Sequence, residues 1–251
     1  AVNAEENIEI THIYLDAENG SDSNSGLTST EARKSWSGAQ PLFTNNSIVH
    51  IAPGVYEFSQ PYECAAGATN ISFIGSGRDN TFLQPAEGAA SNVFTMPYAI
   101  GITFRDMPVR HISSPTTDGA FFNGAGGKNL VVENCNFVSN SVQNGLFKLS
   151  YATNFTFSGC VFERNSCTTG GGMYLYRGSG IITNCVLRRN SGTTGAAFYT
   201  YATDATYVDL LVYANTGVNP PAYCGDSGGT YSDLGADWTK SPGNVLNRCT
   251  F

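Results

Sequence analysis

A 25-residue repeat is the feature that most constrains the fold of this 251-residue chain. Between residues 130 and 216, similar residues recur at that spacing in several columns, a column being the set of equivalent positions in successive repeats. Because the columns stay in register, we do not attribute them to chance, and they predict a stack of similar coils. The columns are Cys135, Cys160, Cys185 and Leu210; Asn140, Asn165, Asn190 and Asn215; Gly145, Gly170 and Gly195; and Tyr151, Tyr176 and Tyr201.

Each repeat has the pattern of short β-strands. Apolar residues occupy the first, third, sixth and eighth positions of equivalent segments, which makes two short alternating stretches separated by a bend. Such alternation is typical of strands with one buried face. One earlier segment fits the same pattern and places Met107 in the cysteine column. The four equivalent segments are 130–137, 155–162, 180–187 and 205–212, and the earlier rungs are 102–109, 70–76 and 47–53.

A unit of this length and strand content is typical of one coil of a parallel β-helix, with coils about 4.8 Å apart. The asparagine column should then form an internal amide ladder, and the cysteine column a buried stack of small apolar groups. We therefore predict an all-β, single-stranded β-helix of about seven coils of ~25 residues. The predicted parts are an N-terminal cap over 1–40, coils over 41–228 and a C-terminal cap over 229–251, with a Cys224–Cys249 disulfide as a candidate clasp.

Composition restricts the partners of the chain. A formal charge of -7 leaves no basic face for nucleic acid, and no run of about 20 apolar residues could span a bilayer. The N-terminal segment is polar and acidic, as after removal of a signal peptide, so we expect a secreted or cell-surface protein. Seven cysteines leave at least one thiol unpaired within the chain, which would permit self-association by cross-linking. Four sequons mark candidate N-glycosylation sites at Asn19, Asn45, Asn70 and Asn154.

Two parts of the sequence resemble known families. Residues 13–36 followed by 48–58 resemble the entry segment of pectin-lyase-fold proteins, and residues 157–174 and 182–199 resemble the repeats of adhesin-type polymorphic outer-membrane proteins. The first resemblance implies a right-handed parallel β-helix. Function stays open, because that superfamily contains lyases, hydrolases, esterases and adhesins.

The catalytic signatures of these enzymes are missing from the sequence. The NTD, DD and GHG elements of polygalacturonases do not occur, and segment 54–58 only approaches the element typical of pectin methylesterases. Carboxylates in the repeats are sparse, and Glu133 and Asp209 do not share a column, so a calcium site is not supported. No cysteine has the spacing of a zinc site. We therefore expect neither a metal nor another cofactor.

One polar column, which aligns Arg110, Glu163, Arg188 and Tyr213 as successive coils, has two interpretations. It could be a groove that binds an anionic glycan, with arginines offsetting the charge and a histidine or tyrosine acting as base. The alternative, which the sequence favours, is a solvated face on which Glu163 offsets its neighbours. The residues in this column and the next are Arg110, His111, Glu163, Arg164, Arg188, Arg189 and Tyr213, of which Arg110, His111, Arg164 and Arg189 are the catalytic candidates and Glu163, Arg188 and Tyr213 the binding candidates.

The tyrosine columns also have two interpretations. Facing outward, Tyr151, Tyr176 and Tyr201 would form a ladder suited to sugar rings, whereas facing inward they would belong to the core. The sequence slightly favours the core. Stacked threonines at 168–169 and 193–194 suggest ice binding as a minor alternative.

These patterns favour a non-catalytic adhesive or structural protein that presents a rigid face to glycans, to a cell-surface or matrix partner, or to copies of itself. The alternative is a polysaccharide lyase or hydrolase that acts on an acidic polysaccharide near the arginines.

Overall fold

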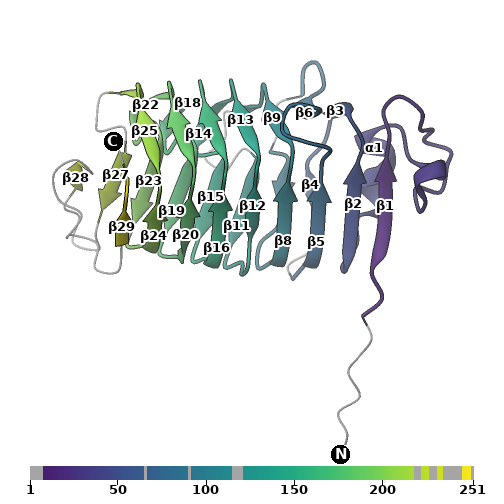
Figure 1. The fold of residues 1–251 in the computed structure, drawn as a ribbon, viewed down its shortest axis with the longest axis horizontal. Coiled ribbons are helices and arrows are strands. Elements are labelled where there is room, and N and C mark those ends of the chain that lie inside the picture. Colours follow the sequence, from purple (N-terminus) through teal and green to yellow (C-terminus); the bar gives the residue numbers. More distant parts are fainter. Residues whose placement is uncertain are drawn as a thin grey trace, which may run out of the picture.

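The computed structural model describes residues 8–64, 67–89, 92–114, 121–217, 222–225, 231–233 and 245–249. The described chain winds into a parallel β-helix, drawn with its long axis horizontal in Figure 1, with β1 near one end and β27 and β29 near the other. Successive turns add one strand to each of three or four sheets, from β2–β4 through β24–β27. The predicted fold class is confirmed, and the number of turns is close to the seven coils expected.

Sheet A is the nine-stranded sheet, and it has a strand from every turn. Its first strand, β1, falls within the segment expected as the N-terminal cap, and its last, β29, falls within the segment expected as the C-terminal cap. The strands of sheet A, in spatial order, are β1 (Thr11–Leu15), β2 (Ser47–Ile51), β5 (Thr69–Ile74), β8 (Ile100–Arg105), β12 (Val131–Glu133), β16 (Thr153–Ser158), β20 (Ser179–Thr183), β24 (Asp204–Val208) and β29 (Val245–Asn247).

Sheet B has seven strands and follows sheet A in each turn of the chain. Single residues in the left-handed backbone conformation make the bend between the two sheets, including Asn134, Asn184 and Asp209, whose side chains tolerate positive φ better than most. The strands of sheet B are β3 (Gly54–Phe58), β6 (Thr81–Pro85), β9 (Pro108–Arg110), β13 (Asn136–Val138), β17 (Val161–Glu163), β21 (Val186–Arg188) and β25 (Leu211–Tyr213).

Sheet C completes the turns, joined from β10 onward by sheet D. Sheet D contains β10 (Ser113–Ser114), β14 (Ser141–Asn144), β18 (Ser166–Thr169), β22 (Ser191–Thr194) and β26 (Thr216–Gly217). Sheet C contains β4 (Tyr62–Glu63), β7 (Phe94–Thr95), β11 (Phe122–Ala125), β15 (Phe147–Ser150), β19 (Met173–Tyr176), β23 (Phe198–Tyr201), β27 (Ala222–Gly225) and β28 (Tyr231–Asp233). Among the described strand pairs only β27 and β28 run antiparallel.

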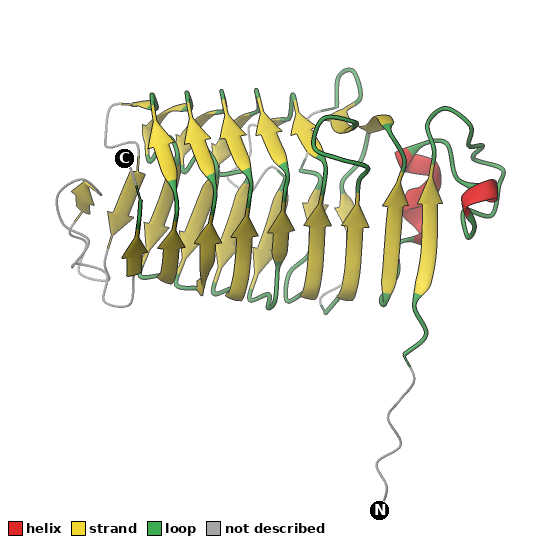
Figure 2. Ribbon diagram, viewed as in Figure 1, coloured by secondary structure: helices red, strands yellow, loops and turns green. Residues whose placement is uncertain are grey.

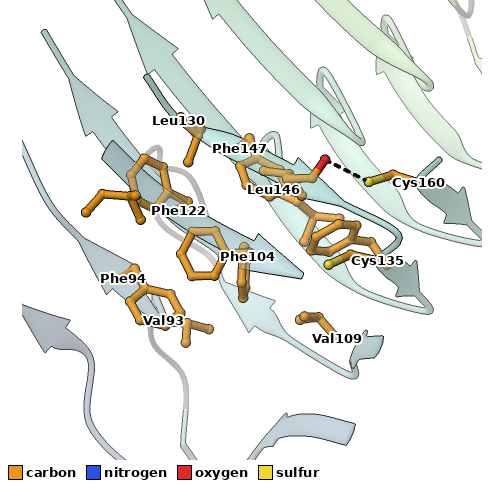
Figure 3. Close-up of a cluster of buried hydrophobic side chains, with 14 of the residues drawn as sticks. Val93, Phe94, Phe104, Val109, Phe122, Leu130, Cys135, Leu146, Phe147 and Cys160 are labelled. Carbon is orange, nitrogen blue, oxygen red and sulfur yellow. Dashed lines mark hydrogen bonds between the residues drawn. The ribbon is translucent and has the colours of Figure 1, made fainter. Parts of the chain in front are cut away.

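The core fills the inside of the coil. Phenylalanines from neighbouring turns pack in continuous contact, with ring centroids 4.9 Å apart for Phe94 and Phe104 and 4.8 Å apart for Phe147 and Phe157. Cys135 and Cys160 are fully buried beside this aromatic cluster (Figure 3). Such contacts between turns give each coil its stability, because no single coil could bury its apolar face alone.

The N-terminal end of the core is closed by a short helical segment. Helices η1 (Ser29–Glu31), α1 (Trp36–Ala39) and η2 (Gln40–Leu42) lie at this end only, as Figure 2 shows for the described residues. Trp36 is 1% exposed and contacts the rings of Phe43, Phe73 and Phe94. The loop before α1 bonds along β1, since Arg33 N donates to Tyr14 O and Asp16 N donates to Arg33 O, both at 2.8 Å. This covers an edge that would otherwise be open to association.

Two columns of the repeat form internal ladders. Nδ2 of Asn140, Asn165 and Asn190 donates to Oδ1 of the asparagine in the next coil, at 2.9, 3.0 and 2.9 Å, and Asn215 ends the series. Each of these Oδ1 atoms also accepts a backbone N–H of the preceding coil. The cysteine column (Met107, Cys135, Cys160, Cys185 and Leu210) is buried throughout, with no member more than 2% exposed.

Candidate functional site

Three arginines converge on one carboxylate where sheet B bends into sheet D. The Glu163 Oε2 atom lies 2.7 Å from Arg188 Nη2, and its Oε1 atom lies 3.2 Å from Arg189 Nη1 and 3.3 Å from Arg164 Nη1. Arg188 Nη1 also lies 3.1 Å from the hydroxyl of Tyr213. We call these five residues the arginine cluster. With three positive charges and one negative charge, it has an excess of two positive charges on a protein of net charge -7.

The local backbone explains this arrangement. Glu163 and Arg188 are paired residues on β17 and β21, one coil apart, so their side chains leave the sheet on the same face. Arg164 and Arg189 follow directly, and both have left-handed backbone with φ of 54° and 55°. Glu163 is only 7% exposed, whereas the side chains of Arg164 and Arg189 are 58% and 52% exposed. The carboxylate is therefore the buried anchor, and the guanidinium groups are the accessible part.

The protonation states of the cluster are set by this geometry. The hydrogen bond from Arg188 and the charges of Arg188 and Arg164 hold the pKa of Glu163 below its usual value. Hydrogen bonds to Tyr213 and Glu163 raise the pKa of Arg188 above its usual value. Glu163 is thus a weak base and Arg188 a weak acid, so the cluster is suited to holding an anion rather than to moving a proton.

Arg110 and His111 are not part of the cluster, which corrects the alignment made from the sequence. They do share the two columns, but the coil with Val138 and Ser139 lies between them and Glu163. Arg110 Nε instead donates to Gln84 Oε1 at 2.9 Å, and its guanidinium carbon lies 4.1 Å from the centroid of the Phe82 ring. The sequence alignment went from Arg110 to Glu163 as successive coils and skipped this intervening coil.

The tyrosines of sheet C face outward, contrary to the slight preference for the core. Tyr174 and Tyr199 stack at 4.9 Å, Tyr176 and Tyr201 stack at 5.2 Å, and both pairs are within 8° of parallel. All four side chains are half-buried, whereas the alternate residues of their strands, such as Leu175, are fully buried. Because each ring stacks face to face on its neighbour, a partner could contact only the ring edges and the hydroxyl groups.

The register of these tyrosines also differs from the sequence alignment. Tyr176 pairs with Ser150 rather than with Tyr151, because the step from β15 to β19 is 26 residues. The extra residue lies in the turn of Gly170, Gly171 and Gly172, a run that the neighbouring coils do not contain. Tyr151 falls at the following bend, with φ of 57° and an exposed fraction of 55%.

A histidine pair that the sequence analysis missed lies on the outer face of sheet A. His12 Nδ1 and His50 Nε2 are 2.9 Å apart, and the ring of Tyr14 lies 4.8 Å from that of His50, within 16° of parallel. Tyr14 and His50 are paired residues on β1 and β2. The available signal was the alternation of THIYL and SIVHI, which places His12, Tyr14 and His50 opposite the buried residues. It was missed because β1 and β2 are separated by a non-repeating loop.

Comparison with known protein families assigns the chain to one of them. A family model described as a right handed beta helix region matches residues 37–216, which is most of the chain. The protein belongs to this right-handed β-helix family. The right-handedness, inferred from resemblance, is thereby confirmed. No curated protein matches the sequence.

Solved structures similar to this right-handed β-helix protein are polysaccharide lyases. A rhamnogalacturonan lyase superposes with a TM-score of 0.58 at 13% identity, covering 86% of this chain and 66% of the lyase. A pectate lyase covers 81% of this chain and 56% of the lyase, with a TM-score of 0.47 and 15% identity. The chain thus spans less than two thirds of either enzyme, and the likeness to the rhamnogalacturonan lyase shows a shared fold alone.

The remaining sequence-based expectations have these positions in the β-helix protein. Asn19, Asn45, Asn70 and Asn154, the candidate glycosylation sites, are all exposed. Cys64, Cys135, Cys160, Cys167 and Cys185 are free thiols, and the side chain of Cys224, and with it the expected Cys224–Cys249 disulfide, lies outside the described residues.

Within the described ranges, no group of three His, Cys, Asp or Glu is arranged to hold a metal ion, and no helix is both long and apolar enough to cross a membrane. Thr169 pairs with Thr194, but the coil before them has Asn144 at this position, so the threonine array is short.

Proposed function

We propose that this protein is a non-catalytic, extracellular glycan-binding β-helix that holds the carboxylates of an acidic polysaccharide at the arginine cluster. The observation that carries the proposal is the convergence of three arginines on the buried Glu163, which leaves two exposed guanidinium groups fixed in place. Guanidinium groups bind carboxylates with two parallel hydrogen bonds, and fixing them beforehand reduces the entropy lost on binding.

The protonation states favour binding over catalysis at this site. A lyase must remove a proton from carbon, which needs a base with a pKa near the working pH. In the arginine cluster the carboxylate has a lowered pKa and Arg188 a raised one, so neither group meets this need. Because a rhamnogalacturonan lyase has a similar fold, polysaccharide cleavage is the competing function, and the test below separates the two.

The test is a double substitution, Arg164→Ala with Arg189→Ala. We expect it to weaken binding of polygalacturonate about tenfold at low salt, since two exposed carboxylate contacts of about 0.7 kcal/mol each are lost. Raising the salt concentration should reduce binding by the intact protein, because exposed charges are screened. Affinity electrophoresis in gels with polygalacturonate, rhamnogalacturonan or neutral dextran measures both effects.

Arg105→Ala is the matched control. Arg105 is also exposed and paired to a carboxylate, Glu133, at 2.8 Å, but it lies on sheet A away from the cluster. Its loss should leave binding unchanged. Equal binding of dextran and polygalacturonate would contradict the proposal, and so would ultraviolet absorbance from unsaturated products, which would make the protein a lyase.

A further inference from the structure

A small cavity lies at the N-terminal end of the β-helix, where sheet A bends toward sheet B. Its volume is about 230 Å³, and its polar lining comes from Tyr14, Asp16, Ser29, His50 and Ser76. The loop that runs along β1 supplies Ser29, and the ends of β1, β2 and the turn after β5 supply the others. Three successive rungs and the loop thus meet here, which places side chains distant in sequence around one space.

Tyr14 and His50 form one wall of this cavity. His50 lines it, with Tyr14 stacked beside it at 4.8 Å and His12 hydrogen-bonded behind it at 2.9 Å. Because His12 occupies Nε2 of His50, the orientation of the His50 ring is fixed. These two rings bring apolar carbon next to polar atoms, which is the usual composition of a sugar-binding wall.

The electrostatics of the cavity differ from those of the arginine cluster. The titratable groups that line it are Tyr14, Asp16 and His50, and its described lining contains no lysine or arginine. Burial and the neighbouring His12 lower the pKa of His50, so its imidazole is neutral at pH 7 and can accept or donate a hydrogen bond. Hydrogen bonds from Asn19 and Glu18 keep the pKa of Asp16 below its usual value, so this carboxylate is charged. An anionic ligand would therefore be repelled.

We propose that this cavity binds a single uncharged sugar residue, with the Tyr14–His50 wall against the ring and with Asp16, Ser29 and Ser76 bonding its hydroxyls. The volume is below the roughly 300 Å³ at which sites for drug-sized ligands begin, so it suits one ring rather than a chain. The site is separate from the arginine cluster and takes a ligand of different charge. A failure of the proposed binding of acidic polysaccharide would therefore leave this sugar site unaffected, and the reverse also holds.

The experiment titrates the full chain with methyl β-D-galactopyranoside and methyl β-D-glucopyranoside while the imidazole ¹⁵N resonances are recorded by NMR. We expect one of the glycosides to shift the resonances of His50 and His12 in a saturable manner at pH 7.5. His50→Ala and Tyr14→Ala should each weaken that binding at least tenfold, and Arg189→Ala should leave it unchanged. Binding should also weaken below pH 6, where His50 takes up a proton.

Several outcomes would overturn the site. One is the absence of any shift of the His50 resonances at about 50 mM of either glycoside, a concentration at which even millimolar sites fill. Binding that survives His50→Ala would place the sugar elsewhere, and galacturonate binding more tightly than the uncharged glycosides would contradict the charge argument. The control is His50→Gln, which keeps a polar side chain of similar length. If its thermal unfolding matches that of the unchanged protein, a loss of sugar binding in this variant is not caused by a loss of folding.

Discussion

Replacing Asn165 by alanine should cost about 3–5 kcal/mol of unfolding free energy, the largest single-residue effect that we expect outside the aromatic core. Asn165 is fully buried and makes four side-chain hydrogen bonds. Its Oδ1 accepts from N and Nδ2 of Asn140 at 3.1 and 2.9 Å, and its Nδ2 donates to Phe137 O and Asn190 Oδ1, both at 3.0 Å. The variant leaves the N–H of Asn140 and the carbonyl of Phe137 without these partners inside a dry bend.

Urea unfolding followed by circular dichroism measures this loss. Asn165→Asp separates the two contributions, because it keeps the volume of the side chain but removes its donors and places a charge in the interior, so it should be at least as destabilising. The matched control is Asn19→Ala. That asparagine is exposed and donates one side-chain hydrogen bond to Asp16 at 3.2 Å, so its loss should change stability by no more than about 0.5 kcal/mol. Similar losses for Asn19→Ala and Asn165→Ala would contradict the role given to the ladder.

The asparagine ladder shows which parts of this fold a sequence can predict. Stacked coils place equivalent residues in contact, so a buried position that requires one side chain repeats that side chain at a constant step. Asn140 to Asn190 and Cys135 to Cys185 therefore revealed both the coil length and their own burial. Core strands were predictable for the same reason, since the alternation of apolar residues and the repeat of equivalent positions predict the same buried face.

Positions on the outer face were less predictable, because a constant step does not hold there. One additional glycine in the turn at Gly170–Gly172 shifted the tyrosines by one residue, which in a strand exchanges the inner and outer faces. The arginine cluster was predicted in part, since Glu163, Arg188 and Tyr213 do pair in successive coils. The His12–His50 contact spans 38 residues across a loop without periodicity, so no repeat could signal it.

Replacing Glu163 by glutamine should have opposite effects on stability and on binding. The carboxylate accepts charge-assisted hydrogen bonds from Arg188 and Arg189 at 2.7 and 3.2 Å, and we expect their loss to cost about 2 kcal/mol of unfolding free energy at pH 7. The same change raises the excess charge of the arginine cluster from two to three. Because one charge about 7 Å from a carboxylate in water contributes about 0.6 kcal/mol, polygalacturonate should bind about threefold more tightly at low salt.

The stability difference should depend on pH in a defined direction. The folded-state pKa of Glu163 lies below its usual value of 4.5, so its ionised form is favoured by folding. That contribution is complete above about pH 5.5 and is lost as the pH falls through the folded-state pKa. The unfolding free energies of the Glu163→Gln variant and the unchanged protein should therefore converge toward pH 3.

Glu133→Gln is the matched control for both measurements. Glu133 and Arg105 form a pair at 2.8 Å whose side chains are 43% and 44% exposed, so its loss should cost no more than about 1 kcal/mol and should not alter binding. A catalytic Glu163 would give a different pattern, in which Glu163→Gln abolishes cleavage of the polymer. Tighter binding without cleavage would instead show that the net charge of the arginine cluster governs binding. Weaker binding would contradict this prediction and show that Glu163 acts chiefly by holding the arginines in place.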